Sequence, residues 1–388
     1  METPALFHGE AHGEAHGEVD TRSPTLNASD DAVPGELVQI GRAPETDGPL
    51  PLVLVPRRAD RRDAASLGAW IDEHRSWVER RLTRHGALLF RGFDAASAPG
   101  LEQVARAIDP ALKNDYLGTS PRNAMAGSSY VFSASELPPY YPIPQHIEMS
   151  FVKAPPRRLF FGCFVAPEGP GGETPLVDFR RVLADLDPAV RARFAQRGVR
   201  NIRNYVGPGG GSRFDLWKLK RWDEMFGTTD RARVDAICRD NGFEATWRPG
   251  ERLRLVNTQP ATRVHPVTGE GVWFNHSQVF HLSAVPDEYR RIAARLGERR
   301  YRALTQVARA MVFLKKRTDA PEDQAMHCTY GDGSPISDGD MDRVRDAIWK
   351  NLVAVRWRKG DVVAIDNAST SHGRLPYRGP RTIAVCWA

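Results

Sequence analysis

The chain has 388 residues, of which 41% are hydrophobic and 26% are charged, and its formal net charge is +6. These values are ordinary for a globular protein, and no Lys/Arg block predicts a nucleic-acid-binding tail. No apolar run approaches the roughly 18 residues that a membrane span requires. The four widely spaced cysteines lack disulfide or CxxC spacing, so we expect reduced thiols in a cytoplasmic protein with neither a membrane nor a nucleic-acid partner.

The first 45 residues differ in composition from the rest of the chain. They contain the repeat FHGEAHGEAHGEVD, in which every unit carries a glycine and few residues are apolar. Such a segment cannot bury enough apolar surface to fold, so we predict a disordered, low-complexity tail over residues 1–45. Residues 46–388 are expected to form one domain.

Ordered structure is predicted to begin near PLPLVLVP, residues 49–56. Asp63 can then cap a helix whose apolar residues recur at three- and four-residue spacing, and Gly86 can end that helix. The following ALLFRGF, residues 87–93, is short and apolar, as expected of a buried strand.

Short β-like runs and turn signals alternate through the rest of the chain, with helical patterns near 179–197, 286–317 and 340–351. This irregular mixture favours a mainly β fold, a sandwich or barrel with helical insertions, over a regular parallel α/β sheet. No glycine-rich nucleotide-binding loop stands at a strand-to-helix junction. The clearest strand predictions are YVFSAS (130–135), RLFFGCFVAP (158–167), VWFNHSQVFHL (272–282), VAVRWRKGDVVAIDN (353–367) and RTIAVCWA (381–388).

His146 and Glu148 stand two residues apart in PIPQHIEMSF, a short segment that contains two prolines. On a β-strand both side chains point to one face, where they either form an ion pair or share a metal ion. Near the C-terminus, His372 lies in a short loop after a predicted strand. Two imidazoles and one carboxylate are the ligand set of non-haem Fe(II) oxygenases, which leaves three coordination positions open. The HxE pair alone does not distinguish this site from an ion pair.

Several further motifs, in a fixed order, resemble the TauD/TfdA family of iron(II)- and 2-oxoglutarate-dependent dioxygenases, in particular its clavaminate synthase-like and SyrP-like branch. The resemblance covers residues 85–388 and implies a double-stranded β-helix, or jelly roll, with helical insertions. That branch carries Glu where many family members have Asp, in agreement with Glu148. The matching motifs are HGALLFRGF (85–93), IPQHIEMSF (143–151), GGETPLVD (171–178), VWFNH (272–276), MHCTYGDGSPI (326–336), WRKGDVVAIDN (357–367) and SHGRLPYRGPR (371–381).

The resemblance also implies roles for individual residues. Thr174 of GGET matches the threonine that hydrogen-bonds 2-oxoglutarate. Arg381 matches the arginine that holds the distal carboxylate of 2-oxoglutarate, for which a planar guanidinium is well suited. Arg374 and Arg378 are close enough in sequence to be alternatives for that role. The residues that match the iron ligands are His146, Glu148 and His372.

The activity that the resemblance implies uses Fe(II), 2-oxoglutarate and O2 to hydroxylate an unactivated C–H bond of a small molecule. The branch suggests an amino acid or a derivative in specialised metabolism, either free or attached to an acidic carrier protein. Desaturation, epoxidation or cyclisation at the same site stays open, whereas Glu148 fills the position that related halogenases leave for halide. The alternatives from another class are a zinc hydrolase with the same ligands and a non-catalytic β-barrel binding protein.

Other polar residues in these motifs are predicted to act around the site. Asp366 and Asn367 are expected to fix the loop that presents His372, as residues behind metal ligands commonly do. The strand that contains VWFNH is expected to line the substrate cavity. The expected substrate contacts are Trp273, Asn275, His276 and Arg374.

Overall fold

The computed structural model describes residues 32–42, 50–118, 122–210 and 220–388. The chain divides into two units, 1–33 and 34–388, and the second unit carries every helix and strand described below. Residues 1–31 of the predicted tail lie outside the described residues. A strand at Val38–Ile40 nevertheless falls within the predicted tail, so ordered structure begins before residue 46.

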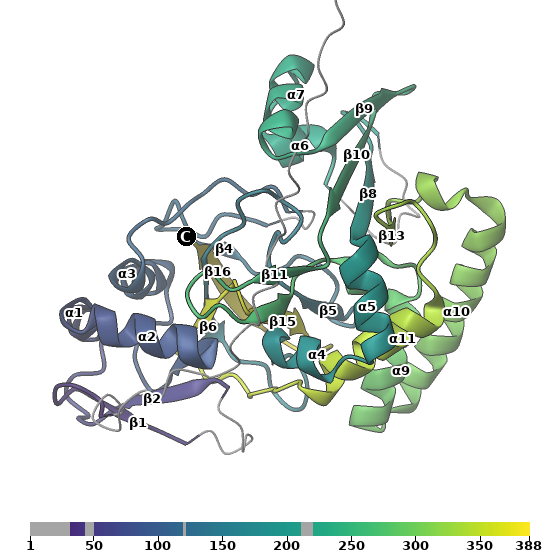
Figure 1. The fold of residues 1–388 in the computed structure, drawn as a ribbon. Coiled ribbons are helices and arrows are strands. Elements are labelled where there is room, and N and C mark those ends of the chain that lie inside the picture. Colours follow the sequence, from purple (N-terminus) through teal and green to yellow (C-terminus); the bar gives the residue numbers. More distant parts are fainter. Residues whose placement is uncertain (1–31, 43–49, 119–121, 211–219) are drawn as a thin grey trace, which may run out of the picture. The chain divides into compact units, whose positions relative to one another are not determined.

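The largest sheet of the second unit has seven strands (Figure 1). Its central strands are rich in β-branched and aromatic residues, which favour the half-buried surface of a sheet. Within the described residues all pairs in this sheet are antiparallel except β2 with β3, in agreement with the expectation against a regular parallel α/β fold. The order across the sheet is β1 (Val38–Ile40), β2 (Leu52–Pro56), β3 (Ala87–Phe90), β14 (Val362–Asp366), β6 (Arg158–Val165), β16 (Thr382–Trp387) and β4 (Phe132–Ser133).

A three-stranded antiparallel sheet packs against the large sheet. Its strands are β5 (Ile143–His146), β15 (Thr370–Arg374) and β7 (Leu176–Asp178), with β15 in the middle. Leu176 of β7 shares one buried apolar cluster with Phe161 of β6 and Val363 of β14. The two sheets therefore face each other across a common core, which is where the candidate site lies.

Two further sheets and the helices complete the unit. A four-stranded sheet has the order β13 (Met326–Tyr330), β8 (Val199–Tyr205), β10 (Arg252–Gln259) and β9 (Glu244–Arg248), and β11 (Thr262–Val264) pairs with β12 (Gly271–Trp273). The helices are α1 (Ala64–Glu73), α2 (Arg75–His85), α3 (Ala98–Ile108), α4 (Phe179–Asp185), α5 (Pro188–Arg197), α6 (Trp222–Phe226), α7 (Arg231–Asp240), α8 (Ser277–Phe280), α9 (Ala284–Leu296), α10 (Arg299–Thr318), α11 (Asp338–Lys350) and the short 3₁₀ helix η2 (Pro321–Asp323).

The helix predicted between Asp63 and Gly86 is present but divided in two. Asp63 caps α1 by accepting the Ser66 N–H at 2.8 Å, and Gly86 ends α2 with a φ of 77°. At His74 the backbone leaves helical geometry, with φ −115° and ψ 25°, before α2 begins. Both predicted ends are therefore confirmed, whereas the break was not predicted because His74 carries no breaker signal.

Three predicted strands are much shorter than expected, and of the predicted 130–135 strand only β4, Phe132–Ser133, is present. The 272–282 strand was wrong beyond Trp273, because the Asn275 side chain accepts the Ser277 N–H at 2.9 Å in the turn that precedes the short helix α8. Only Val362–Asp366 of the predicted 353–367 strand pairs in the large sheet, since Lys359 and Gly360 form a turn before it. All four cysteines are unpaired and buried.

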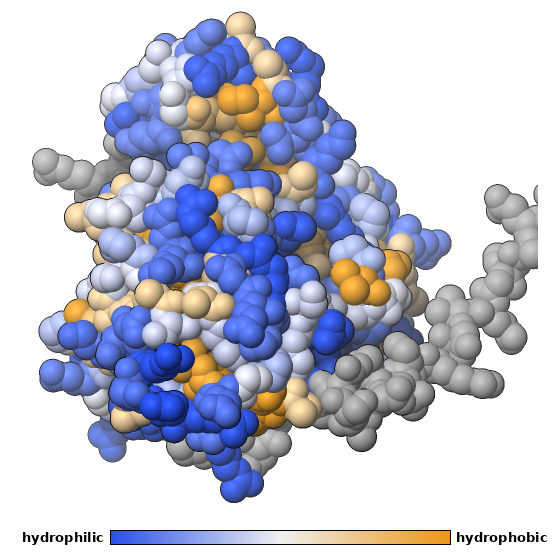
Figure 2. All heavy atoms as spheres, turned by 90° about the vertical axis from the view of Figure 1, so that its left-hand side faces the viewer, coloured by the Kyte–Doolittle hydropathy of each residue, from blue (hydrophilic) through white to orange (hydrophobic). Residues whose placement is uncertain are grey.

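Among the described residues, each helix is either too short or too polar to cross a bilayer. On the face shown in Figure 2, apolar side chains form small separate groups within a largely hydrophilic surface. Such scattered apolar groups are normal on a globular protein, and the cytoplasmic location stays a prediction.

Candidate active site

Two histidines from different strands lie side by side in the three-stranded sheet. β5 ends at His146, and His372 of the antiparallel strand β15 is directly opposite. Directly opposite residues point to the same face, and the two ring centroids are 4.3 Å apart. The ring of Phe161, from the large sheet, lies 5.0 Å from that of His372. The imidazole pair is therefore enclosed between the two sheets.

Glu148 reaches the same point from a turn, not from the strand that the sequence predicted. The strand ends at His146, and Glu148 lies in the turn that follows, next to Met149 with a φ of 51°. Asn367 accepts the Glu148 N–H at 2.9 Å and donates to the Glu148 carbonyl at 3.0 Å. Asn367 thus positions Glu148, whereas we had expected it to fix a loop around His372, which instead lies within strand β15.

The three side chains fit a single metal ion. One donor atom from each lies within 4.8 Å of the others. His146 Nδ1 lies 2.9 Å from the Pro144 carbonyl oxygen, which requires a proton on Nδ1 and leaves Nε2 free to bind metal. His372 Nε2 faces Glu148 Oε2 at 3.6 Å. Two nitrogen donors and one oxygen donor match the set that Fe(II) takes with three positions open.

Burial and neighbouring charges set the protonation of the candidate ligands. Burial, followed by the neighbouring His372 imidazole, lowers the pKa of His146 to about 4, so His146 is neutral at neutral pH. Burial alone would raise the pKa of Glu148, but the Arg122 guanidinium and the two imidazoles hold it well below its usual range. The site therefore offers an ionised carboxylate beside a neutral imidazole, as a divalent metal requires.

Tyr116 and Arg122, which the sequence analysis missed, contact the Glu148 carboxylate. Arg122 Nη2 donates to Oε2 at 2.7 Å, and the Tyr116 hydroxyl donates to Oε1 at 3.2 Å. The Arg122 and Glu148 side chains are only 5% and 4% exposed, and the guanidinium lies over the Tyr116 ring at 4.6 Å. Arg122 and Tyr116 lie 26 and 32 positions before Glu148, and neither belongs to a motif, so sequence spacing could not identify them.

Thr174 and Arg381, which the sequence matched to 2-oxoglutarate contacts, lie together in the structure. Arg381 Nη2 donates to the Thr174 hydroxyl oxygen at 3.2 Å. The indole N–H of Trp357, which the sequence analysis did not single out, donates to the same oxygen at 3.2 Å. Thr174 stands two residues before Leu176, which pairs with His372 in the sheet. The segment that carries Thr174 is therefore joined to strand β15, which carries the candidate metal ligand His372.

The Arg381 guanidinium keeps its charge in a buried setting. Burial first, and the neighbouring Arg374 second, lower its pKa to about 10, so it is positively charged at neutral pH. Its hydrogen-bond partners within the described residues are neutral, namely the Thr174 hydroxyl and the Gly172 carbonyl. A buried guanidinium without a carboxylate partner is suited to bind the carboxylate of a small molecule.

The glycines of the GGET motif are required by the backbone around Thr174. Gly171 has a φ of 92°, and a Cβ added there would lie 2.1 Å from the Pro376 carbonyl oxygen. The segment therefore packs against the backbone that leads from His372 to Arg381. The motif is explained by this close approach.

The two other arginines after His372 have different surroundings. Arg374 donates to three backbone carbonyls in the segment 137–141, at 2.7 to 3.0 Å, and so holds that loop. The Arg378 side chain is 74% exposed and lies 3.7 Å from Glu298. Of the three arginines, Arg381 is the one that contacts Thr174.

Of the predicted substrate contacts in VWFNH, His276 lies next to the candidate metal ligands. Its ring centroid is 5.6 Å from that of His146, and its Nδ1 lies 2.6 Å from the Ser150 hydroxyl. Trp273 and Asn275 are fully buried and bond within the fold, to Gln278 and to backbone groups. The structure thus places His276 beside the site, and the substrate role of all these residues stays a prediction.

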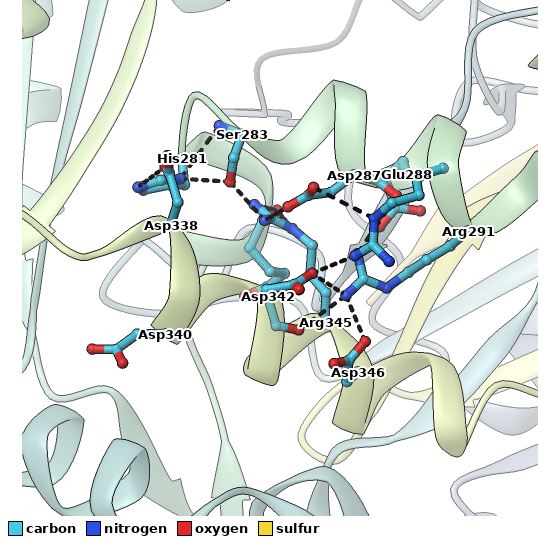
Figure 3. Close-up of polar contacts among 12 residues, drawn as sticks. His281, Ser283, Asp287, Glu288, Arg291, Asp338, Asp340, Asp342, Arg345 and Asp346 are labelled. Atoms are coloured by element: carbon cyan, nitrogen blue, oxygen red, sulfur yellow. Dashed lines mark hydrogen bonds and ion pairs between the residues drawn. The ribbon is translucent and has the colours of Figure 1, made fainter. Parts of the chain in front are cut away.

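His281, in the same segment, belongs to a separate polar network between α8, α9 and α11 (Figure 3). Its Nδ1 lies 2.9 Å from the Ser283 hydroxyl, which accepts a bond from the buried Arg345 at 2.8 Å. Arg345 also pairs with Asp287 at 2.7 Å. This network joins helices, and His281 is not among the three clustered ligand residues.

Known proteins resemble this chain over most of its length. Residues 49–387 match the family model described as taurine catabolism dioxygenase TauD, TfdA family. The dapdiamide synthesis protein DdaC of Enterobacter agglomerans is 31% identical over 83% of this chain and 88% of its own length. A clavaminate synthase-like protein of Arabidopsis thaliana is 28% identical over 81% and 84%. The solved structure of PvcB from Pseudomonas aeruginosa aligns with this chain over 94% of the length of each, at 14% sequence identity and with a TM-score of 0.48.

Proposed function

We propose a function that starts from the family of this chain. The chain belongs to the TauD/TfdA family of dioxygenases. As such it is a dioxygenase that depends on iron and 2-oxoglutarate. We infer that it hydroxylates a C–H bond of a small molecule. The observation that carries the proposal is the convergence of His146, Glu148 and His372, one donor atom each, within 4.8 Å.

The three ligand residues would hold Fe(II), and the bound iron would supply the activation of O2. The residues of the chain supply position and charge. His146 is oriented by the Pro144 carbonyl, and the Glu148 carboxylate by Arg122, so both donors are fixed before metal binds. Glu148, as the third ligand, would fill the position that related halogenases leave for halide, so hydroxylation is favoured over halogenation. The branch of the family that carries Glu at this position also suggests hydroxylation.

The position of 2-oxoglutarate follows from its two carboxylates. We propose that Arg381 binds the distal carboxylate and that the Thr174 hydroxyl donates a second hydrogen bond to it. The charge of Arg381 is buried and forms no ion pair with a carboxylate within the described residues, so the distal carboxylate of 2-oxoglutarate would supply that partner. We further propose that the two facing sheets form a double-stranded β-helix, which agrees with the position of the site between them.

The substrate class is inferred from relatives and from chemistry. DdaC is a protein of dapdiamide synthesis, which favours a biosynthetic substrate such as an amino acid or its derivative. Desaturation, epoxidation or cyclisation of such a substrate requires the same ligand set. Family membership argues against the zinc hydrolase and the non-catalytic binding protein as alternatives.

A carrier protein that delivers the substrate is part of the same proposal. The helix α10, RRYRALTQVARAMVFLKKRT, contains seven Lys and Arg residues and no acidic residue. Val307, Phe313 and Leu314 are more than half exposed on this helix. A basic surface with exposed apolar residues is complementary to an acidic carrier protein.

The test is anaerobic titration of the Fe(II)-loaded protein with 2-oxoglutarate, followed by visible absorption. Chelation of Fe(II) by the keto acid is expected to give a weak charge-transfer band, which the His372→Ala variant should lack. If fully loaded protein gives no such band, the proposed cofactor pair is wrong for this chain.

A further inference from the structure

Three buried polar side chains lie on a largely apolar face of the four-stranded sheet, where Asn257 also donates to Gln259 at 3.1 Å. Asn201 and Arg203 stand two residues apart on β8 and therefore point to the same face. Asn257 of β10 is the direct cross-strand partner of Asn201. None of the three is more than 5% exposed. Their neighbours on this face, including Leu255 and Cys328, belong to the main apolar core.

These side chains retain unused hydrogen-bonding groups. Both amide atoms of Asn201, Oδ1 of Asn257, and Nε and Nη2 of Arg203 have no hydrogen-bond partner in the part of the chain that the structure describes. Nη1 of Arg203 donates a hydrogen bond to the Tyr205 hydroxyl oxygen at 3.2 Å. A buried guanidinium without an anion is costly, so the arrangement indicates that another molecule supplies the missing groups.

The cluster is connected to the candidate active site through aromatic rings. The Arg203 guanidinium lies over the Phe151 ring at 4.1 Å and over the Phe243 ring at 4.7 Å. The Phe151 ring is 4.9 Å from His276, which in turn is 5.6 Å from the candidate ligand His146. Three successive contacts, Arg203 with Phe151, Phe151 with His276 and His276 with His146, thus connect the cluster to the candidate ligand.

We propose that Arg203, with Asn201 and Asn257, binds the carboxylate end of the substrate. The guanidinium presents its unused Nε and Nη2 as a fork that matches two carboxylate oxygens. The free amide of Asn201 both donates and accepts, so it suits an N–H group beside that carboxylate. The substrate is accordingly an amino acid or N-acylated amino acid with a free carboxylate; where the α-carboxyl is attached to a carrier protein as a thioester, the carboxylate that Arg203 binds is one on the side chain or acyl group. This inference rests on the proposed function, in which Arg381 is already occupied by 2-oxoglutarate and a second carboxylate needs a second guanidinium.

The first experiment separates a ligand-binding arginine from a structural one. In Arg203→Met an apolar side chain replaces a charge that contacts two phenylalanine rings and has no ion-pair partner among the described residues. The variant is therefore expected to be at least as resistant to urea as the wild type. A strongly destabilised variant would show that Arg203 supports the fold, and would overturn the proposal. Arg203→Lys keeps the charge and serves as the conservative comparison.

The second experiment measures calorimetric binding of N-acetylglycine to the metal-free full chain. We expect about tenfold weaker binding to Arg203→Met and an intermediate loss for Arg203→Lys, which lacks the planar fork. Neutral N-acetylglycinamide should bind the wild type about tenfold more weakly than the acid. Arg381→Met should still bind N-acetylglycine, which assigns the signal to Arg203.

Equal binding to the wild type and Arg203→Met would overturn the proposal, as would no binding to the wild type. Because no metal is present, this result is independent of the titration with iron and 2-oxoglutarate. A positive titration together with Arg203-independent binding would leave the dioxygenase function intact and remove only the assignment of the substrate carboxylate.

Discussion

His146 and His372 are direct cross-strand neighbours, so the imidazole pair of the site is fixed by the register of β5 and β15. A shift of one residue in that register would turn one ring to the opposite face of the sheet. The local sheet therefore fixes two of the three candidate ligands, and the turn held by Asn367 positions the third, Glu148.

The first prediction concerns metal affinity. His372→Ala removes one of three ligands without altering the backbone of β15, so Mn(II) binding measured by calorimetry should weaken by more than about 100-fold. His327→Ala, a histidine on β13 outside the ligand cluster, is the control and should bind Mn(II) as the wild type does. Equal affinities in the two variants would exclude His372 as a ligand.

The second prediction separates the arginines that follow His372. Arg381→Met removes the buried guanidinium beside Thr174, and the affinity of the Mn(II)-loaded protein for 2-oxoglutarate should fall by about 10- to 100-fold. Arg378→Met changes a side chain that is 74% exposed and should leave that affinity unchanged. The reverse result would transfer the carboxylate contact to Arg378.

The third prediction uses the buried pair of Arg122 and Glu148. Removal of one partner of such a pair leaves an uncompensated charge, so Arg122→Met should destabilise the metal-free protein by about 3–5 kcal/mol in urea unfolding. Mn(II) supplies a new positive partner for Glu148, so saturating Mn(II) should reduce this deficit. A deficit that is the same with and without Mn(II) would mean that Glu148 does not bind the metal.

A control for this variant is an arginine with an exposed partner. Arg58 and Asp60 form an ion pair whose side chains are 58% and 62% exposed. Water screens such a pair, so Arg58→Met should leave stability unchanged whether or not Mn(II) is present.

Much of the site could be read from the sequence because its residues lie in short local motifs. The HxE pair and GGET each combine chemically distinctive residues within four positions. The glycines of GGET also have a backbone reason, the contact of Gly171 with the Pro376 carbonyl. The family resemblance predicted that Thr174 and Arg381 each contact 2-oxoglutarate. The structure places the two side chains in contact with each other, and their roles toward 2-oxoglutarate stay a prediction.

The residues that were missed act through long-range contacts. Tyr116, Arg122 and Trp357 each reach the site from a segment without regular hydrogen-bonding pattern, so neither periodicity nor spacing marks them. The turn at Glu148 was also missed, because Asn367 enforces it from 219 positions away. The strand predicted over 272–282 failed for a local reason, since the Asn275 side chain competes with the strand hydrogen bonds.

The last prediction concerns acid stability and the network around His281. Burial, followed by the charge of Arg345, lowers the pKa of His281 to about 4, against about 6.5 in an unfolded chain. The unfolded chain then binds the proton more tightly, so the free energy of unfolding decreases as the pH falls from 6.5 toward 4. Between pH 7 and pH 5 this one histidine should account for about 2 kcal/mol of lost stability.

His281→Asn tests this assignment because asparagine does not titrate. The variant has lower stability at pH 7, since contacts to Ser283 and to the Ile336 carbonyl are altered, but its further loss between pH 7 and pH 5 should be smaller than in the wild type. Urea unfolding of both proteins at the two pH values measures the difference. The buried histidines at the candidate metal site contribute the same loss of stability in both proteins, so their contribution cancels in the comparison. Identical losses would show that His281 is protonated in the folded protein at pH 5, and that the Ser283–Arg345 network tolerates its charge.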